Sequence, residues 1–197
     1  MQQSYERPNN LDEALTLLDQ SPRQVLAGGT DVYAALGDHS SLGHVLDVTA
    51  IPDLTGIKDA GDHWRIGASS TWSDVLAANL PKSFDCLKLA AREVGGIQIQ
   101  NAGTIAGNLC NASPAADSVP PLIAADAVAT IIGPNGTREE AVENIITGPG
   151  KTSLSDGEFI VSFAFPKRVA HSGDCYLRLT PRTEMDIAVV GISANLT

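Results

Sequence analysis

A window of small and polar residues, 103 to 117, constrains the fold of this chain more than any other stretch. It reads GTIAGNLCNASPAAD and consists mostly of glycine, alanine and residues with hydroxyl or amide groups, with a single carboxylate at Asp117. This composition is unsuited to a core element. Glycine lets a backbone approach a ligand closely, and Thr, Asn and Ser add short-range donors and acceptors. A second segment of the same kind, Ala27-Gly28-Gly29-Thr30-Asp31, lies upstream, so the two together predict a ligand cradle formed by the backbone.

The flanking sequence predicts helices and strands in mixed order, and therefore an α+β fold. Capping-box patterns at Asn10–Glu13 and Thr71–Asp74, each followed by apolar residues at helical spacing, predict helices over 11–20 and 71–79. The first glycine pair follows a short strand and precedes a short helix through Leu36, capped by Thr30 or Asp31. Further helices are expected at 84–94, 119–127 and 139–146, and strands at 23–27, 45–48, 63–68, 128–132, 158–165, 176–179 and 187–192, with a hairpin turn at 133–136.

The charge of the chain limits its partners. The formal net charge is −10, with a pI near 4.6, which argues against nucleic acid and against an anionic membrane surface as partners. If the ligand is anionic, backbone N–H groups and helix N-termini must hold its phosphates in place of lysines. The sequence shows neither a leader nor an apolar run of membrane-spanning length, so we expect a cytoplasmic protein.

The cysteines and histidines predict no metal site, because they are scattered and none falls at a ligand spacing. We expect the cysteines to be free thiols. The residues concerned are Cys86, Cys110, Cys175, His39, His44, His63 and His171.

Both glycine segments also have a plain structural interpretation. Neither matches the GxxxxGK[ST] or GxGxxG phosphate fingerprints, and a Gly-Gly pair before a helix can be no more than a tight connection. Asp117 could be the N-cap of the helix that follows, which is worth about 1 kcal/mol. Alternatively, its carboxylate could accept hydrogen bonds from ligand hydroxyls.

Five motifs in order give the chain a resemblance to a known family. They are Gly28-Gly29-Thr30-Asp31, Thr104-Ile-Ala-Gly-Asn108, Ser113-Pro114-x-x-Asp117, Glu158-x-Ile-Val-Ser162 and Arg182-x-x-x-Asp186-Ile-Ala188. Together they resemble the FAD-binding (medium) subunit of molybdenum hydroxylases of the xanthine dehydrogenase and carbon monoxide dehydrogenase type. The match covers nearly the whole chain.

The resemblance implies a two-lobed, PCMH-type (vanillyl-alcohol-oxidase-like) α+β domain that binds FAD non-covalently, with a truncated C-terminal domain. The implied units are residues 1–56 and 57–166 for the two FAD-binding lobes, and 167–197 for the start of the truncated domain. The implied partners are an iron–sulfur small subunit with [2Fe–2S] clusters and a large subunit with molybdopterin. The implied activity is that of an oxidoreductase subunit that passes electrons from these clusters through FAD to NAD or another acceptor.

The resemblance also implies which residues contact the cofactor, and it assigns none of them as a general acid, base or nucleophile. Residues 25–32 would surround the FAD pyrophosphate, residues 104–108 would form a second backbone cradle, and three further positions would lie along the site. Of these three, Asp117 would bind the flavin side, Val161 would be an apolar lining residue, and Arg178 falls where relatives often have a lysine near the flavin. The implied set is Val25, Leu26, Ala27, Gly28, Gly29, Thr30, Asp31, Val32, Thr104, Ile105, Ala106, Gly107, Asn108, Asp117, Val161 and Arg178.

Two positions depart from the family pattern. Ala106 replaces the first glycine of a Thr-Ile-Gly-Gly-Asn motif, and Gln100 stands where a basic residue is common. Because the C-terminal domain is expected to be truncated, a flavin-free structural or interaction module that keeps the fold is an alternative function. A nucleotide-binding enzyme of unrelated chemistry is a third.

Overall fold

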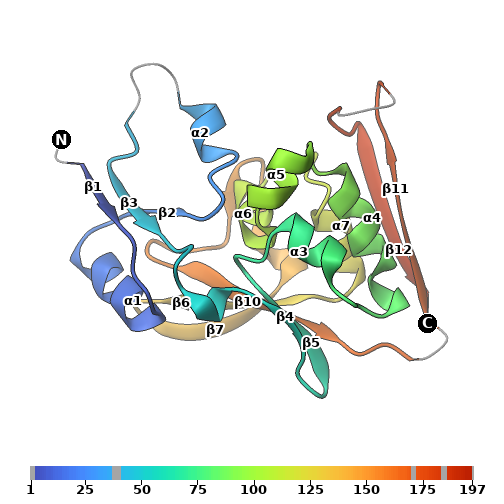
Figure 1. The fold of residues 1–197 in the computed structure, drawn as a ribbon, viewed down its shortest axis with the longest axis horizontal. Coiled ribbons are helices and arrows are strands. Elements are labelled where there is room, and N and C mark those ends of the chain that lie inside the picture. The colour runs from blue at the N-terminus through green and yellow to red at the C-terminus, as the bar shows by residue number, and fades with distance from the viewer. Residues whose placement is uncertain (1–2, 37–40, 170–171, 183–185, 197) are drawn as a thin grey trace.

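The computed structural model describes residues 3–36, 41–169, 172–182 and 186–196. Two of the histidines discussed above, His39 and His171, lie outside these ranges, as do the three central positions of the Arg182–Asp186 motif. Figure 1 shows the order and arrangement of the elements. In chain order they are β1 (Ser4–Glu6), α1 (Leu11–Gln20), β2 (Gln24–Leu26), α2 (Val32–Ala35), β3 (His44–Asp47), the 3₁₀ turn η1 (Pro52–Leu54), β4 (Ile57–Asp59), β5 (His63–Gly67), α3 (Trp72–Ala77), the 3₁₀ turn η2 (Lys82–Phe84), α4 (Asp85–Glu93), α5 (Ile97–Ala102), α6 (Ile105–Asn111), α7 (Val119–Ala124), β6 (Val128–Gly133), β7 (Gly136–Ala141), α8 (Val142–Ile145), β8 (Ile146–Gly148), β9 (Lys151–Thr152), β10 (Phe159–Pro166), β11 (Gly173–Leu179) and β12 (Val190–Leu196).

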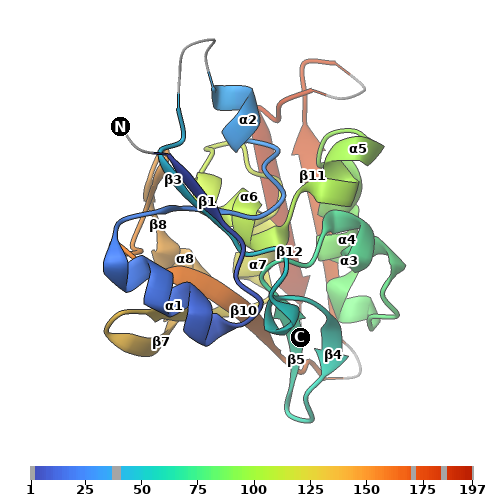
Figure 2. The same ribbon diagram turned by 60° about the vertical axis from the view of Figure 1, so that its left-hand side comes forward.

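The strands form two main sheets. A small parallel sheet has the order β1-β3-β2, and an antiparallel sheet has the order β4-β5-β10-β6-β7. We call the small sheet together with α1 the N-terminal lobe, and α3 to α7 the helical layer. Figure 2 shows α1 and the helices α3 and α4 on different sides of the larger sheet.

Strand β10 contributes to two hydrophobic cores because its side-chain alternation changes phase. Phe159 and Val161 pack into the core of the N-terminal lobe, whereas Phe163 and Phe165 pack into the larger core under the helical layer. Strict alternation would place all four on one face. The register against β6 shifts between Ile160 and Ser162, which is a β-bulge, and the extra residue turns the later side chains to the other face.

The hairpin β11–β12 has an inverted distribution of polar and apolar residues. Figure 1 shows it beside α4, and it also contacts α7. Its inner face carries polar side chains, including Asp174, Tyr176 and Arg178, that point toward the helices. Its outer face carries apolar side chains, among which Leu177 and Ile192 are paired across the strands and are 71% and 63% exposed.

The inner face of this hairpin contacts α4 near both ends of the helix, and the charge of each contacting side chain is complementary to the helix end that it meets. The Asp174 carboxylate accepts from the backbone N–H of Cys86 in the first turn of α4, at 3.0 Å. At the other end, Arg178 donates to the carbonyl oxygen of Glu93. A negative group at the N-terminal end and a positive group at the C-terminal end both complement the helix dipole.

Several sequence predictions are confirmed. Helix 11–20 has the predicted bounds, with Asn10 as its N-cap, and Thr71 and Asp74 form a reciprocal capping box at α3. The helix over 139–146 is wrong, because β7 continues to Ala141 and only Val142–Ile145 is helical. The small-residue window also contains a helix, α6, that its composition had not indicated.

Candidate functional site

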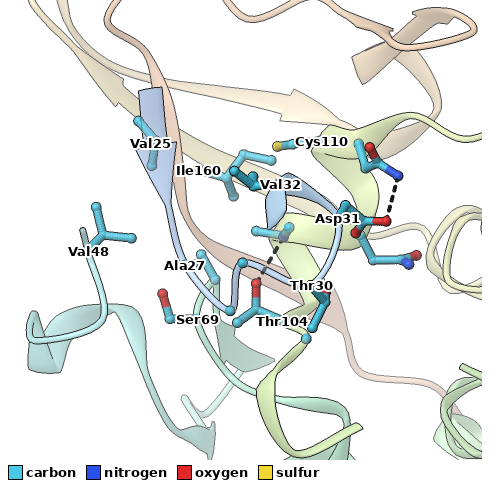
Figure 3. A pocket seen from close by; sticks show the side chains of 18 of the residues that line it. Val25, Ala27, Thr30, Asp31, Val32, Val48, Ser69, Thr104, Cys110 and Ile160 are labelled. Carbon is cyan, nitrogen blue, oxygen red and sulfur yellow. Dashed lines mark hydrogen bonds between the residues drawn. The ribbon is translucent and has the colours of Figure 1, made fainter. Parts of the chain in front are cut away.

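A cavity of about 600 Å³ lies where the N-terminal lobe meets the helical layer. One wall is the loop 27–32 after β2, and another is the start of α6 at Thr104. Figure 3 shows Val48 and Ile160 among the apolar side chains that line it. The volume lies within the roughly 300–1,000 Å³ typical of ligand and cofactor sites.

Two glycines bring the loop 27–32 against the chain at the end of α5. A Cβ on Gly28 would lie 1.8 Å from the carbonyl oxygen of Ala102, so a side chain there would force two backbones apart. Gly29 has a φ of +69°, which favours glycine. Among the described residues, the N–H groups of Gly28, Gly29, Thr30 and Asp31 donate to no protein acceptor. Four successive free donors beside a cavity suit an anionic ligand.

The second glycine segment contributes small side chains more than N–H donors. Thr104 is the N-cap of α6, and its hydroxyl oxygen accepts from the Gly107 N–H at 3.1 Å. The N–H groups of Ile105 and Ala106 donate to carbonyl oxygens of the 68–70 turn. Because Ala106 is helical and its N–H is paired, its methyl group is accommodated without the freedom of glycine.

The cavity contains no lysine or arginine among its described lining residues. Its acidic side chains are already engaged: Asp31 accepts from Asn111 at 3.1 Å (Figure 3), and Glu158 is held by Arg138 at 2.8 Å. The hydrogen bonds from Arg138 lower the pKa of Glu158. An anionic ligand would therefore be held by neutral donors, as the acidic composition predicts.

The cysteines are free thiols, as expected. Cys110 contributes to the cavity wall, and burial raises its pKa to about 12. It is therefore a neutral thiol at physiological pH. Within the described part of the chain, no three His, Cys, Asp or Glu side chains gather as metal ligands.

The structure brings most of the sequence-predicted residues to this one cavity. Those that line it are Val25, Ala27, Gly28, Gly29, Thr30, Asp31, Val32, Thr104, Ala106, Gly107 and Asn108. Leu26 and Ile105 are buried behind the walls, and Val161 packs into the N-terminal lobe. Asp117 and Arg178 lie outside the lining, in a cluster under the hairpin β11–β12.

The Asp117 carboxylate accepts hydrogen bonds from the hairpin. Tyr176 donates its hydroxyl hydrogen to Asp117 Oδ1 at 2.6 Å, and Arg178 Nη1 lies 3.2 Å from the same oxygen. Arg178 also pairs with Glu93 at 2.9 Å. Burial, and then the hydrogen bond to Asp117, raises the pKa of Tyr176. The N-cap position of α7 is Ser118, and no side chain caps that helix, so the interpretation of Asp117 as an N-cap is wrong.

Gln100 has a structural role that the sequence did not indicate. It is 9% exposed, and its Nε2 donates to the carbonyl oxygens of Arg92 and Gly95. The Arg92 carbonyl belongs to the last turn of α4, where a side-chain donor replaces a missing helical hydrogen bond, and Gly95 lies two residues beyond the end of the helix. Its amide group is therefore committed to α4.

Sequence reasoning missed several lining residues. Val48, Ser69, Asn111 and Ile160 belong to four separate segments that meet only in the folded chain. Val48 and Ile160 are aliphatic residues of the type found at ordinary core positions. Asn111 had a signal because it lies in the small-residue window, and Ile160 had one because it belongs to the Glu158-x-Ile-Val-Ser162 motif.

Comparison with known proteins identifies the class. Residues 1–168 match the family described as the FAD binding domain in molybdopterin dehydrogenase, and the chain belongs to this family of flavin-binding oxidoreductase subunits. The xanthine dehydrogenase FAD-binding subunit of Escherichia coli O157:H7 is 36% identical over 197 residues, covering 98% of this chain and 68% of the relative. The carbon monoxide dehydrogenase medium chain of Hydrogenophaga pseudoflava is 29% identical over 183 residues, covering 91% and 64%.

Solved structures show the same fold. Carbon monoxide dehydrogenase from Hydrogenophaga pseudoflava superimposes with a TM-score of 0.89 at 29% identity, covering 97% of this chain and 68% of that chain. Carbon monoxide dehydrogenase from Oligotropha carboxidovorans superimposes with a TM-score of 0.93 at 26% identity, covering 100% and 70%. The α+β, two-lobed fold expected from the resemblance is thus confirmed. No helix in the described ranges is long and apolar enough to cross a bilayer.

The cavity fits FAD on its own geometry. A dinucleotide has an anionic pyrophosphate, and the Gly28–Asp31 loop offers four N–H donors that have no acceptor in the described part of the chain, at a backbone that has no side chain at two positions. The apolar side chains at the junction of the two cores could contact the rest of such a cofactor.

Proposed function

We propose that this chain is the electron-transfer subunit of a molybdopterin-dependent hydroxylase or dehydrogenase complex. In this proposal, electrons from [2Fe–2S] clusters in a small subunit pass through FAD in this chain to NAD or another acceptor, and a large subunit holds molybdopterin. The family membership and the relatives' names support the assembly. The observation that carries the role of this chain is the cavity with its row of free N–H groups.

When bound, FAD supplies the redox chemistry. The residues of this chain bind and orient it. The loop 27–32 donates backbone N–H groups to the pyrophosphate, the start of α6 allows close approach, and Ile160 and Val48 exclude water from the apolar end. Leu26, Ile105 and Val161 support these walls from behind.

We also propose that Asp117 and Arg178 act at the flavin side of the cofactor, beside the hairpin β11–β12. Their mutual ion pair at 3.2 Å would set the charge near that end of the site. We further propose three units: lobes over 1–56 and 57–166, and a C-terminal unit from 167. The small sheet, the five-stranded sheet and the hairpin each fall within one of these units, which supports the division.

The test is flavin content. Purified protein should be yellow, release FAD on denaturation, and take up added FAD after the cofactor is removed. Gly28→Ala should abolish uptake, because its Cβ would meet the Ala102 carbonyl oxygen. Gly148→Ala is the matched control, since nothing lies within 4 Å of a Cβ there. Colourless protein that takes up no FAD would refute the proposal and favour a flavin-free structural module.

A further inference from the structure

Ser118 contacts the cavity wall from behind, through Asn108. Its hydroxyl donates to Asn108 Oδ1 at 2.5 Å, and Ser118 itself is 0% exposed. Asn108 is half-buried and lines the cavity. The buried Ser118 hydroxyl has one hydrogen and donates it to this one acceptor. Breaking the hydrogen bond would leave a buried polar group unpaired, so the bond is costly to lose.

This contact favours one orientation of the Asn108 amide, because a flipped amide would donate Nδ2 to the Ser118 oxygen and leave the buried hydroxyl hydrogen without this acceptor. An asparagine side chain has one acceptor oxygen and one NH₂ donor group, and the two exchange places when the amide flips. Since Oδ1 is turned to Ser118, Nδ2 is the polar atom left over. Among the described residues, Nδ2 donates to no protein acceptor. In a cavity without a lysine or arginine among its described lining residues, it adds a neutral donor on the α6 side.

The position of Ser118 is itself fixed from both sides. The preceding residue, Asp117, is held by Tyr176 at 2.6 Å and by Arg178 at 3.2 Å, both from β11. The carbonyl oxygen of Ser118 accepts from Leu122 in the first turn of α7. The hairpin and α7 therefore hold the hydroxyl in place, and no part of this support touches the cavity lining.

We propose that Ser118 is a positioning residue for the cofactor site. It locks the Asn108 amide so that Nδ2 donates to an acceptor oxygen of the bound dinucleotide, on the pyrophosphate or on the flavin. The inference rests on the proposed binding of FAD. An unlocked amide could present Oδ1 instead, which would repel an acceptor-only group.

A double-mutant cycle on FAD affinity tests this inference. Ser118→Ala should raise the Kd about fivefold in the native background, equivalent to about 1 kcal/mol, the worth of a neutral hydrogen bond. In an Asn108→Ala background the same change should have almost no effect, because there is no amide left to orient. Ser113→Ala is the matched control: its hydroxyl lies in the same loop but contacts the Ala115 N–H, and the Kd should stay within about twofold.

The outcomes are distinguishable. An equal effect of Ser118→Ala in both backgrounds overturns the inference, because the residue would then act only through general stability. If the unaltered chain takes up no FAD, the proposed function fails and the inference fails with it. Parallel titrations with ADP locate the oxygen: a matching loss of ADP affinity places it on the pyrophosphate, and a loss confined to FAD places it on the flavin.

A second variant covers the case in which Ser118→Ala does not fold. Asn108→Asp keeps an acceptor for Ser118, replaces the donor group with an oxygen and adds a negative charge. If Nδ2 donates to the cofactor, Asn108→Asp should weaken binding more than Asn108→Ala does. Equal or tighter binding by Asn108→Asp would overturn the inference.

Discussion

Replacing Asp117 by alanine should cost the fold about 2–4 kcal/mol of unfolding free energy. The carboxylate holds two buried donors: the Tyr176 hydroxyl at 2.6 Å and the Arg178 guanidinium at 3.2 Å. The side chains of Asp117 and Arg178 are only 13% and 10% exposed, so water would solvate the freed groups poorly. A hydrogen bond to a charged group contributes about 1.5–3 kcal/mol, and breaking a buried ion pair costs about 3–5 kcal/mol. Arg178 keeps its contact with Glu93, which lowers the total.

Urea denaturation of the FAD-free protein would measure this loss, because it separates fold stability from cofactor binding. Asp117→Asn is the matched control. It keeps an acceptor for Tyr176 but removes the charge and replaces the second carboxylate oxygen with an NH₂ group, so it should cost roughly half as much. A loss below about 0.5 kcal/mol for Asp117→Ala would show that the cluster contributes no more than an exposed salt bridge, and would refute the reasoning.

Three further predictions follow from the charges and thiols. FAD affinity should change less than about twofold between low and high salt, because the described lining residues include no lysine or arginine. A steep loss of affinity in a titration with NaCl would mean that a positively charged side chain outside this lining binds the phosphates. The Glu158 carboxyl has its pKa lowered below 4.5 by Arg138, so its stabilising contribution is present above pH 4.5 and is lost as the pH falls through the folded-state value. Arg138→Met should therefore flatten the acid limb of a plot of unfolding free energy against pH, and an unchanged slope would contradict this assignment. With a thiol reagent at pH 8, the exposed Cys175 should react first. The partly buried Cys110 should react more slowly, and the buried Cys86 only on unfolding, because burial raises the pKa of both thiols to about 12. Simultaneous modification of all three would contradict this order.

The sequence predicted those features well that depend on interactions between neighbouring residues. The capping boxes fixed the starts of α1 and α3, because side-chain caps depend only on neighbouring residues. The Gly28-Gly29 pair predicted a close approach to a ligand, whereas the close contact that the structure shows at Gly28 is with the backbone of Ala102, far along the chain. What the pair could not specify was this partner, since the contact is between backbones and leaves no side-chain signal.

Other features depend on contacts across the fold. Asp117 was open to two interpretations because its partners, Tyr176 and Arg178, lie about sixty residues away on β11. The helix α6 was not expected because glycine and asparagine have poor helix propensity; its end at Ala112 takes φ 48°, with the Ala112 N–H bonded to Leu109. Tertiary packing of Ile105 and Leu109, both 0% exposed, overrides that propensity.

Because of the β-bulge in β10, the exact number of residues in this strand determines which of the two cores each later side chain enters. Side chains can be enlarged or reduced to repair many packing faults, but no substitution restores a missing position in a strand. Deleting Val161 would send Phe163 and Phe165 toward the N-terminal lobe and leave the core under the helical layer without two fully buried aromatic side chains. Insertions and deletions in this strand should thus be far less tolerated than substitutions at the same sites, and a family member with a different strand length would need a compensating change in β6.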